Sequence, residues 1–122
     1  DKINSMKYYS HEKNIYEFEI PTTKILNYNL PISGGGYLRI IPWLIFKFLF
    51  HKELNLRNEY QMFLHPFELY SGKFKLPISV SVSDYLRFSI GRKNNLKKVT
   101  YLIDYAKSKN FKFKTIKQSI IN

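Results

Sequence analysis

A glycine turn that runs directly into an apolar segment constrains this chain more than any other feature of its sequence. Residues 34–36 are three successive glycines, whose backbone can adopt positive φ and approach a ligand closely. Residues 40–50 contain a single charged side chain, that of Lys47, and are too few to span a bilayer. This pattern predicts a helix from residue 37 or 38 to about residue 54, with Pro42 in its first turn. Because the helix is apolar nearly all round, it must be buried, lie on a membrane or have lost its covering partner.

The second informative stretch is an apolar segment that ends on a histidine. Residues 60–65 predict a buried strand, and Pro66 ends it. This strand places His65 at its C-terminal end and Glu68 three residues later. A neutral imidazole in such a position can act as a general acid, a general base or a metal ligand. The alternative is a core histidine that is satisfied by one hydrogen bond.

The remaining segments alternate between strand and helix patterns. The spacing of apolar residues predicts a helix from Asn94 or Asn95 to about Lys109, stopped by Asn110, and a final helix that begins at Thr115. The pattern also predicts extended segments at residues 15–20, 24–30, 78–82 and 111–113, a loop at 67–77 and irregular structure at 84–92. This order favours an α/β fold, with residues 1–122 as a single domain.

Composition indicates a folded chain with an excess of positive charge. Apolar residues make up 44% of the chain, and 20 basic residues against 9 acidic ones give a net charge of +11. Such a charge is compatible with nucleic acid, anionic lipid or an acidic polymer as a partner, but Lys, Asn, Ile, Tyr and Phe are all abundant and all have AT-rich codons, so coding bias is the stronger interpretation. Lys97 and Lys98 fall on the polar side of the predicted helix, where a solvated face is expected. The absence of cysteine excludes disulfides and thiolate metal sites.

No complete motif of a common catalytic or metal site is present, so the candidates are individual residues. The H-E-x-x-H pattern begins at His11 but lacks its second histidine, and the glycines do not form a phosphate loop. Arg39 could bind a carboxylate in bidentate fashion or be a surface arginine. Tyr37 could form the wall of a sugar site or belong to the core. Glu68 could orient His65, pair with an arginine or be a solvated loop acid.

Three stretches taken together resemble the C-terminal half of the NodB-like polysaccharide deacetylases. They are E-I-P at residues 19–21, L-P-I-S-G-G-G-Y-L-R-I-I-P at residues 30–42 and F-L-H-P-F-E-L at residues 63–69. The similarity is greatest to the bacterial subgroup that is encoded with exopolysaccharide biosynthesis genes. Arg87, Arg92, the helix that follows them and residues 111–116 also resemble the end of such proteins.

This resemblance implies the C-terminal portion of an irregular (β/α) barrel and the metal-dependent removal of acetyl groups from an N-acetylated sugar polymer. In that chemistry a divalent metal, usually zinc, polarises the amide and activates water. His65 matches the late histidine that acts as general acid and protonates the leaving amine. Arg39 is the candidate to orient the base aspartate of the missing half. The candidates for substrate binding are Tyr37, Gly35, Gly36 and Glu68.

The sequence also departs from the family pattern. The early motifs of the family, T-F-D-x-E and H-x-x-x-H, supply the base and the metal ligands and have no counterpart here. We therefore expect a C-terminal fragment of a larger deacetylase domain, which alone holds no metal and turns over no substrate. Its expected partners are the missing N-terminal half and an N-acetylated polysaccharide.

Two rival functions remain open. The first is a non-catalytic basic module that binds an acidic polysaccharide or nucleic acid, although no nucleic-acid motif supports the latter. The second is a membrane-surface protein that uses residues 38–50 as an interfacial helix. The run has no strongly polar face, which argues for burial instead. The cellular location stays open.

Overall fold

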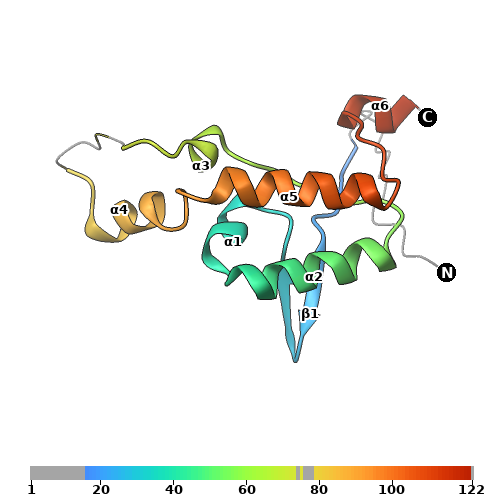
Figure 1. Cartoon of the computed structure of the whole chain (residues 1–122), viewed down its shortest axis with the longest axis horizontal. Coiled ribbons are helices and arrows are strands. Elements are labelled where there is room, and N and C mark those ends of the chain that lie inside the picture. Colours follow the sequence, from blue (N-terminus) through green and yellow to red (C-terminus); the bar gives the residue numbers. More distant parts are fainter. Residues whose placement is uncertain (1–15, 74, 76–78, 122) are drawn as a thin grey trace.

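The structure, a computed structural model, describes residues 16–73, 75 and 79–121 (Figure 1). The elements of these residues are β1 (Thr22–Ile25), β2 (Tyr28–Pro31), α1 (Gly35–Ile40), α2 (Trp43–Leu56), α3 (Pro66–Leu69), α4 (Val82–Ser89), α5 (Asn95–Ser108) and α6 (Ile116–Ile121). The two long helices, α2 and α5, pack against each other, and α1 and α3 contact α5 nearer its N-terminal end. The hairpin projects from the far side of α2 in this view.

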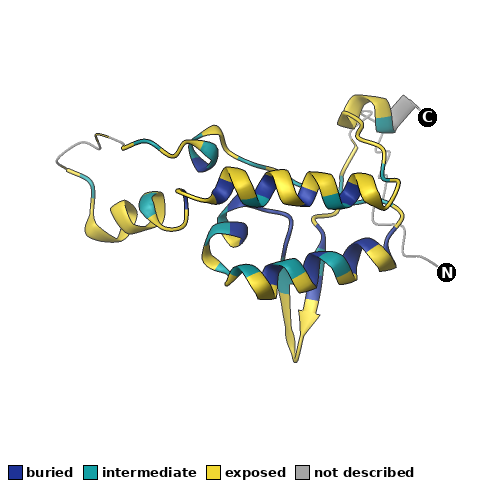
Figure 2. Cartoon of the chain, in the orientation of Figure 1, coloured by how far each residue is buried: buried dark blue, intermediate teal, exposed yellow. Residues whose placement is uncertain are grey.

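The hydrophobic core lies between α1, α2 and α5. Figure 2 shows buried residues recurring along α2 and α5, while exposed residues occupy the other sides of both helices. The buried apolar residues are Ile32, Leu38, Phe46, Leu49, Phe50, Leu54, Val99, Leu102 and Ala106. On α5, Val99, Leu102 and Ala106 follow the helical repeat and confirm part of the apolar stripe that the sequence predicts for that helix; Leu96 and Ile103, which belong to the same predicted stripe, are 55% and 37% exposed.

The single helix predicted over residues 37–54 is instead two helices, which is a correction. Ile41 has extended backbone (φ −69°, ψ 134°), so α1 ends there and α2 begins after Pro42. The ring of a proline disfavours helical backbone in the residue before it, which explains the break. Part of the apolar surface of α2 is left uncovered, since Leu44 and Phe48 are 72% and 67% exposed.

The extended segment predicted over residues 24–30 is an antiparallel hairpin. Thr22 pairs with Pro31 and Ile25 with Tyr28, and Leu26 in the turn has φ 53°. The guanidinium of Arg57, at the end of α2, donates to the carbonyl of Thr22 (3.2 Å) and binds the buried Glu53. The prediction of a strand over residues 15–20 is wrong for residues 16–20, which form no regular element; residue 15 lies outside the described residues.

Residues 60–65 are extended but do not form the predicted strand. Phe63 alone makes a parallel bridge to Gly34: its N–H donates to Ser33 (2.9 Å) and its carbonyl accepts from Gly35 (3.1 Å). Tyr60 donates its hydroxyl proton to the carbonyl of Ile32 (2.6 Å), and burial raises the pKa of this hydroxyl. One bridge and one side chain therefore join the glycine turn to this segment.

The loop predicted over residues 67–77 and the irregular segment predicted over residues 84–92 each contain a helix. Pro66 begins α3, where its missing N–H costs nothing. Ser81 caps α4 by accepting from the N–H of Asp84 (3.2 Å), a Ser-x-x-Asp start signal. The segment over residues 78–82, predicted as an exposed strand or a linker, is not a strand at residues 79–82, and Val82 is helical; residue 78 lies outside the described residues.

The C-terminal segment agrees with most of the sequence predictions. The helix α5 matches the predicted limits within one residue, and Asn110 has φ 63°, which confirms it as the stop. Thr115 is bonded to Gln118 at the start of α6. Residues 111–113 are not a strand, because they have no pairing neighbour among the described residues.

The described part of the chain is thus a mixed α/β structure that is mostly helical. Its regular sheet is one two-stranded antiparallel hairpin, and these residues form no barrel. Within the same residues, no helix is both long enough and apolar enough to cross a membrane.

Candidate functional site

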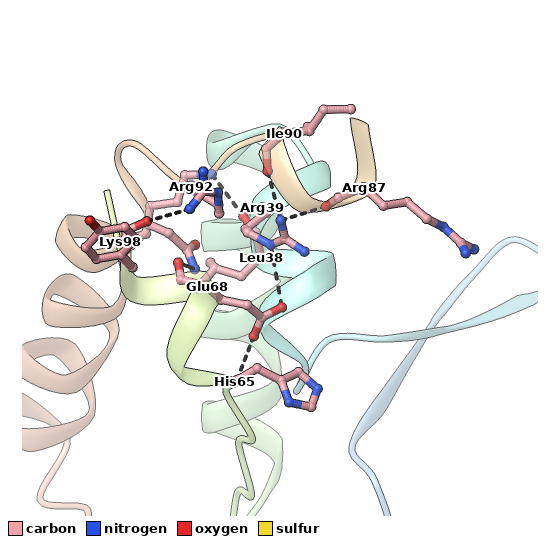
Figure 3. A network of polar contacts seen from close by, with 10 residues as sticks. Leu38, Arg39, His65, Glu68, Arg87, Ile90, Arg92 and Lys98 are labelled. Atoms are coloured by element: carbon pink, nitrogen blue, oxygen red, sulfur yellow. Dashed lines mark hydrogen bonds and ion pairs between the residues drawn. The ribbon is translucent and has the colours of Figure 1, made fainter. Parts of the chain in front are cut away.

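A buried carboxylate, that of Glu68, lies at the centre of the candidate site (Figure 3). Its residue is 2% exposed, so the interpretation of Glu68 as a solvated loop acid is wrong. One carboxylate oxygen, Oε2, accepts from the backbone N–H of His65 (2.9 Å), and the other, Oε1, lies 3.5 Å from Nε of Arg39. Of the two contacts suggested by the sequence, the pairing with an arginine is present, whereas the contact with His65 is to its backbone and not to its imidazole. Contact with a substrate would require this carboxylate to be uncovered.

Glycine is needed in the turn at residues 34–36 because residues 63–68 pack closely against its backbone. A Cβ on Gly35 would overlap the carboxylate of Glu68 and approach the Leu64 side chain to 2.8 Å. A Cβ on Gly34 would lie 2.9 Å from the ring of Phe63. A Cβ on Gly36 would meet only an ordinary contact, at 3.9 Å from Glu68. Two of the three glycines thus serve the close approach of residues 63–68.

The side chain of Arg39 is enclosed by the end of α4. Its Nη1 donates to the carbonyls of Arg87 (3.0 Å) and Ile90 (3.1 Å), and its guanidinium carbon lies 5.3 Å from the centre of the Phe67 ring. Because the side chain is only 7% exposed, the alternative of a free surface arginine is wrong. Gly91 completes the enclosure, with φ +73° and no room for a Cβ beside the backbone carbonyl of Arg39.

Arg92, just before α5, and two side chains in its first turns hold α1, α3 and the segment after α3 in place. Arg92 donates to the carbonyls of Tyr70 (3.0 Å) and Gly72 (3.3 Å), and Asn95 donates to that of Glu68 (3.0 Å). Lys98 donates to the carbonyl of Leu38 (2.9 Å), and burial lowers the pKa of its ammonium group. Lys98 therefore does not belong to a solvated face.

Sequence reasoning missed this use of the polar residues at the start of α5. The sequence offered one signal, a second capping-type residue, Asn95, directly after Asn94; in the structure Asn95 is the first residue of α5 and is fully buried.

The ring of His65 lies on the surface, and Figure 3 shows it directed away from Arg39. The rings of Phe63 and Phe67 flank it, at 6.5 Å and 5.7 Å between centroids. The alternative of a core histidine is therefore wrong. Because only its backbone is bound by Glu68, the imidazole of His65 is accessible to a reacting molecule.

Tyr37 is also accessible, since it is 39% exposed on α1. The residue before it, Gly36, is partly buried. The parallel bridge between Gly34 and Phe63 brings the start of α1 and the segment leading to His65 to the same part of the molecule. The structure thus gathers three of the predicted residues beside one bridge, with Glu68 and Arg39 inside and His65 outside, while Tyr37 exposes its ring on α1.

A divalent metal has no evident ligand set here. Among residues 16–73, 75 and 79–121, no group of three or more His, Cys, Asp or Glu side chains could hold a metal ion. The described residues therefore do not fit the metal that the resemblance implies.

Comparison with known proteins gives a family but no activity. No curated protein and no solved structure matches the chain. One family model, described as a domain of unknown function (DUF3473), matches residues 2–121, which is nearly the whole chain. The chain therefore belongs to the DUF3473 family.

Proposed function

We propose that this DUF3473 chain is the C-terminal part of a carbohydrate N-deacetylase and supplies the general acid of its active site. The observation that carries the proposal is the accessible imidazole of His65, whose backbone is fixed by a buried carboxylate beside the glycine turn. The substrate would be an N-acetylated sugar polymer, and the bond broken would be its amide C–N bond.

The parallel bridge supports an incomplete (β/α) barrel as the parent fold. Parallel pairing places the C-terminal ends of both segments, Gly34 and His65, at the same edge, which is where such barrels carry their active sites. In this proposal further strands from a complementary segment would extend the pair and close the barrel. The exposed apolar side of α2, which includes Leu44 and Phe48, would offer it packing surface.

The chemistry assigned to this chain is proton donation. An imidazolium at His65 would protonate the nitrogen of the leaving amine, and such a transfer contributes roughly 10²–10⁴-fold to rate. The divalent metal, zinc in first place, would polarise the amide, and its ligands would come from the complementary segment. No step of the proposal assigns that metal to the described residues.

The position of Arg39 supports a role that differs from the predicted one. Its Nη1 is bonded to two carbonyls and its Nε faces Glu68. Arg39 would therefore act on His65 through Glu68, as a positioning residue. The orientation of a base aspartate by Arg39 stays a prediction that the complementary segment would have to test.

The test is acetate release from an N-acetylated oligosaccharide in the presence of zinc. The product of the intact gene should be active, and His65→Ala should lower kcat by roughly 10²–10⁴-fold. His51→Ala is the matched control, because His51 lies on α2 and contacts Tyr101 and Tyr105 instead. The 122-residue chain alone should release no acetate. Full activity of His65→Ala, or turnover by the isolated chain, would contradict the proposal.

A second candidate function, binding of an acidic polysaccharide, has one specific observation in its favour. Lys47 of α2 lies over the ring of Tyr101 (5.6 Å), and Lys109, next to the end of α5, lies over that of Tyr105 (5.6 Å). His51 stacks on Tyr105 at 3.6 Å, so these ring faces are already occupied and offer little for nucleic-acid bases. A steep fall in binding with added salt would support this function.

A further inference from the structure

The helix α4 carries an apolar stripe that the described part of the chain leaves uncovered. None of its 8 residues is buried, and Val82, Tyr85 and Leu86 are 77%, 53% and 48% exposed. Figure 1 shows α4 near one end of the molecule, beyond the N-terminal end of α5 and away from the pair formed by α2 and α5. The stripe of Val82, Tyr85 and Leu86 is therefore a separate surface from the exposed side of α2.

A contact on the opposite side of α4 fixes the direction in which the stripe faces. The ring of Phe88 packs against that of Phe67, with 5.2 Å between the centroids. Because successive residues of a helix are rotated by roughly 100°, Leu86 lies on the side opposite Phe88. Val82 lies one turn before Leu86 on the same side. The stripe thus points away from the rest of the molecule.

Polar contacts at its two ends hold α4 in place without the stripe. Ser81 accepts from the N–H of Asp84 (3.2 Å) and donates to its carboxylate (2.7 Å). At the other end, Arg39 donates to the carbonyls of Arg87 and Ile90. Since the described residues do not use the stripe for packing, substitutions in it should leave the fold intact.

The surroundings of α4 are strongly basic. Residues 70–103 contain seven basic side chains and one acidic one, that of Asp84, which already accepts from Ser81. Arg87 follows Leu86 directly and borders the stripe, and Figure 3 shows its side chain directed away from the polar contacts around Glu68. The exposed basic residues of this region are Lys73, Lys75, Arg87, Lys93 and Lys97. A partner that fits this surface must combine apolar contact area with negative charge.

We propose that α4 docks this chain on an anionic phospholipid membrane, with the stripe in the boundary between headgroups and acyl chains. Helices that lie in this boundary combine an apolar stripe with basic residues beside it, and aromatic rings with a polar tip, such as that of Tyr85, favour the same depth. The basic side chains add attraction to the negative surface of the lipids. A soluble polyanion would use the charges but leave the stripe in water. The inference does not depend on the proposed function, because it concerns attachment and not the chemistry at His65.

The experiment is co-sedimentation of the 122-residue chain with vesicles of phosphatidylglycerol and phosphatidylcholine in equal parts, and with vesicles of phosphatidylcholine alone. We expect binding to the anionic vesicles to be at least roughly tenfold tighter. Val82→Ser combined with Leu86→Ser should weaken it by roughly tenfold, because apolar area is lost. Arg87→Gln should weaken it by roughly fivefold. Leu86→Trp should retain it, since tryptophan favours the membrane interface.

The matched control is a comparable apolar pair on α2. Leu44 and Phe48 are 72% and 67% exposed, and Leu44→Ser combined with Phe48→Ser should leave vesicle binding unchanged. Circular dichroism of each variant shows that the helices are retained. If the α2 variant loses binding while the α4 variant keeps it, the membrane contact belongs to α2 and the inference is overturned.

Two other results would also overturn the inference. If the serine variant of α4 binds anionic vesicles as tightly as the unchanged chain, charge alone holds the chain, and a soluble acidic polymer is the fitting partner. If the unchanged chain binds neither kind of vesicle, the stripe belongs to a contact with protein.

Discussion

The α2–α5 layer and the region around Glu68 are held together in different ways. Between α2 and α5, apolar side chains at helical spacing interlock, and ring contacts such as Trp43 with Tyr101 (5.2 Å) close the seam. Around Glu68, charged and amide side chains reach backbone carbonyls of other elements, and glycines allow the approach. The first region depends on the area removed from water and the second on a small set of polar contacts.

This difference determines how each region should respond to change. Apolar packing is shared among many contacts, so losing one side chain weakens the whole layer in proportion to the volume removed. A buried polar cluster fails at single atoms, because an unpaired buried group costs its full desolvation. We therefore expect substitutions in the α2–α5 layer to change mainly the free energy of unfolding. Substitutions around Glu68 should change mainly the position of His65.

The largest expected effect is a cavity in the layer. Phe46 is 0% exposed in α2, and Phe46→Ala should lower the free energy of unfolding by about 3–5 kcal/mol. Leu44→Ala, on the exposed side of the same helix, is the control and should change it by less than about 0.5 kcal/mol. Urea unfolding followed by circular dichroism gives both values. A similar loss for the two variants would mean that a partner covers the exposed side.

The next largest loss of unfolding free energy is expected from the polar contacts around Glu68. Glu68→Ala should cost about 3 kcal/mol, because it leaves the buried Arg39 without its carboxylate and the N–H of His65 without its acceptor. Glu68→Gln keeps an acceptor for that N–H and should cost less. The amide resonance of His65 should move far in the alanine variant and little in the glutamine variant. Unchanged stability of Glu68→Ala would show that the pair contributes nothing net.

Sequence patterns predicted the layer far better than the cluster. The helix α5 follows from the repeat of Val99, Leu102 and Ala106, and its stop follows from Asn110, because both signals are local. The cluster depends on Arg39 and two carbonyls that lie 48 and 51 residues later in the chain. A backbone carbonyl carries no residue identity, so no pattern could reveal these partners.

The sequence named the residues of the candidate site but not their arrangement. The motifs brought His65 and Glu68 into one site, and the structure adds that the carboxylate is enclosed while the imidazole faces solvent. Burial of Glu68 follows from its fit against Gly35, which is a matter of shape between distant segments. The helix α4 could have been anticipated from Ser81 and Asp84, a start signal that is followed by Val82, Tyr85 and Leu86 at helical spacing.

A smaller effect separates two neighbouring glycines. Gly35→Ala should lower the free energy of unfolding by about 1–3 kcal/mol, because its Cβ would displace the carboxylate of Glu68. Gly36→Ala is the matched control: its Cβ fits, and alanine favours the helix by roughly 1 kcal/mol, so the variant should be as stable or more so. Equal melting of the two variants would mean that the turn relaxes without cost.

The smallest effect is a pH dependence confined to the layer. Burial, and then the charges of Lys47 and Lys109, lower the pKa of His51 from its ordinary value of 6.5. The unfolded chain therefore binds the proton more readily, and His51 contributes stability above about pH 6.5 that is lost as the pH falls below it. His51→Gln removes this contribution, so the difference in unfolding free energy between the two proteins should shrink from about pH 7.5 to about pH 5.5. The His65 ring is present in both proteins and cancels from the difference. A difference that stays constant with pH would show that the seam of His51, Tyr101 and Tyr105 tolerates an imidazolium.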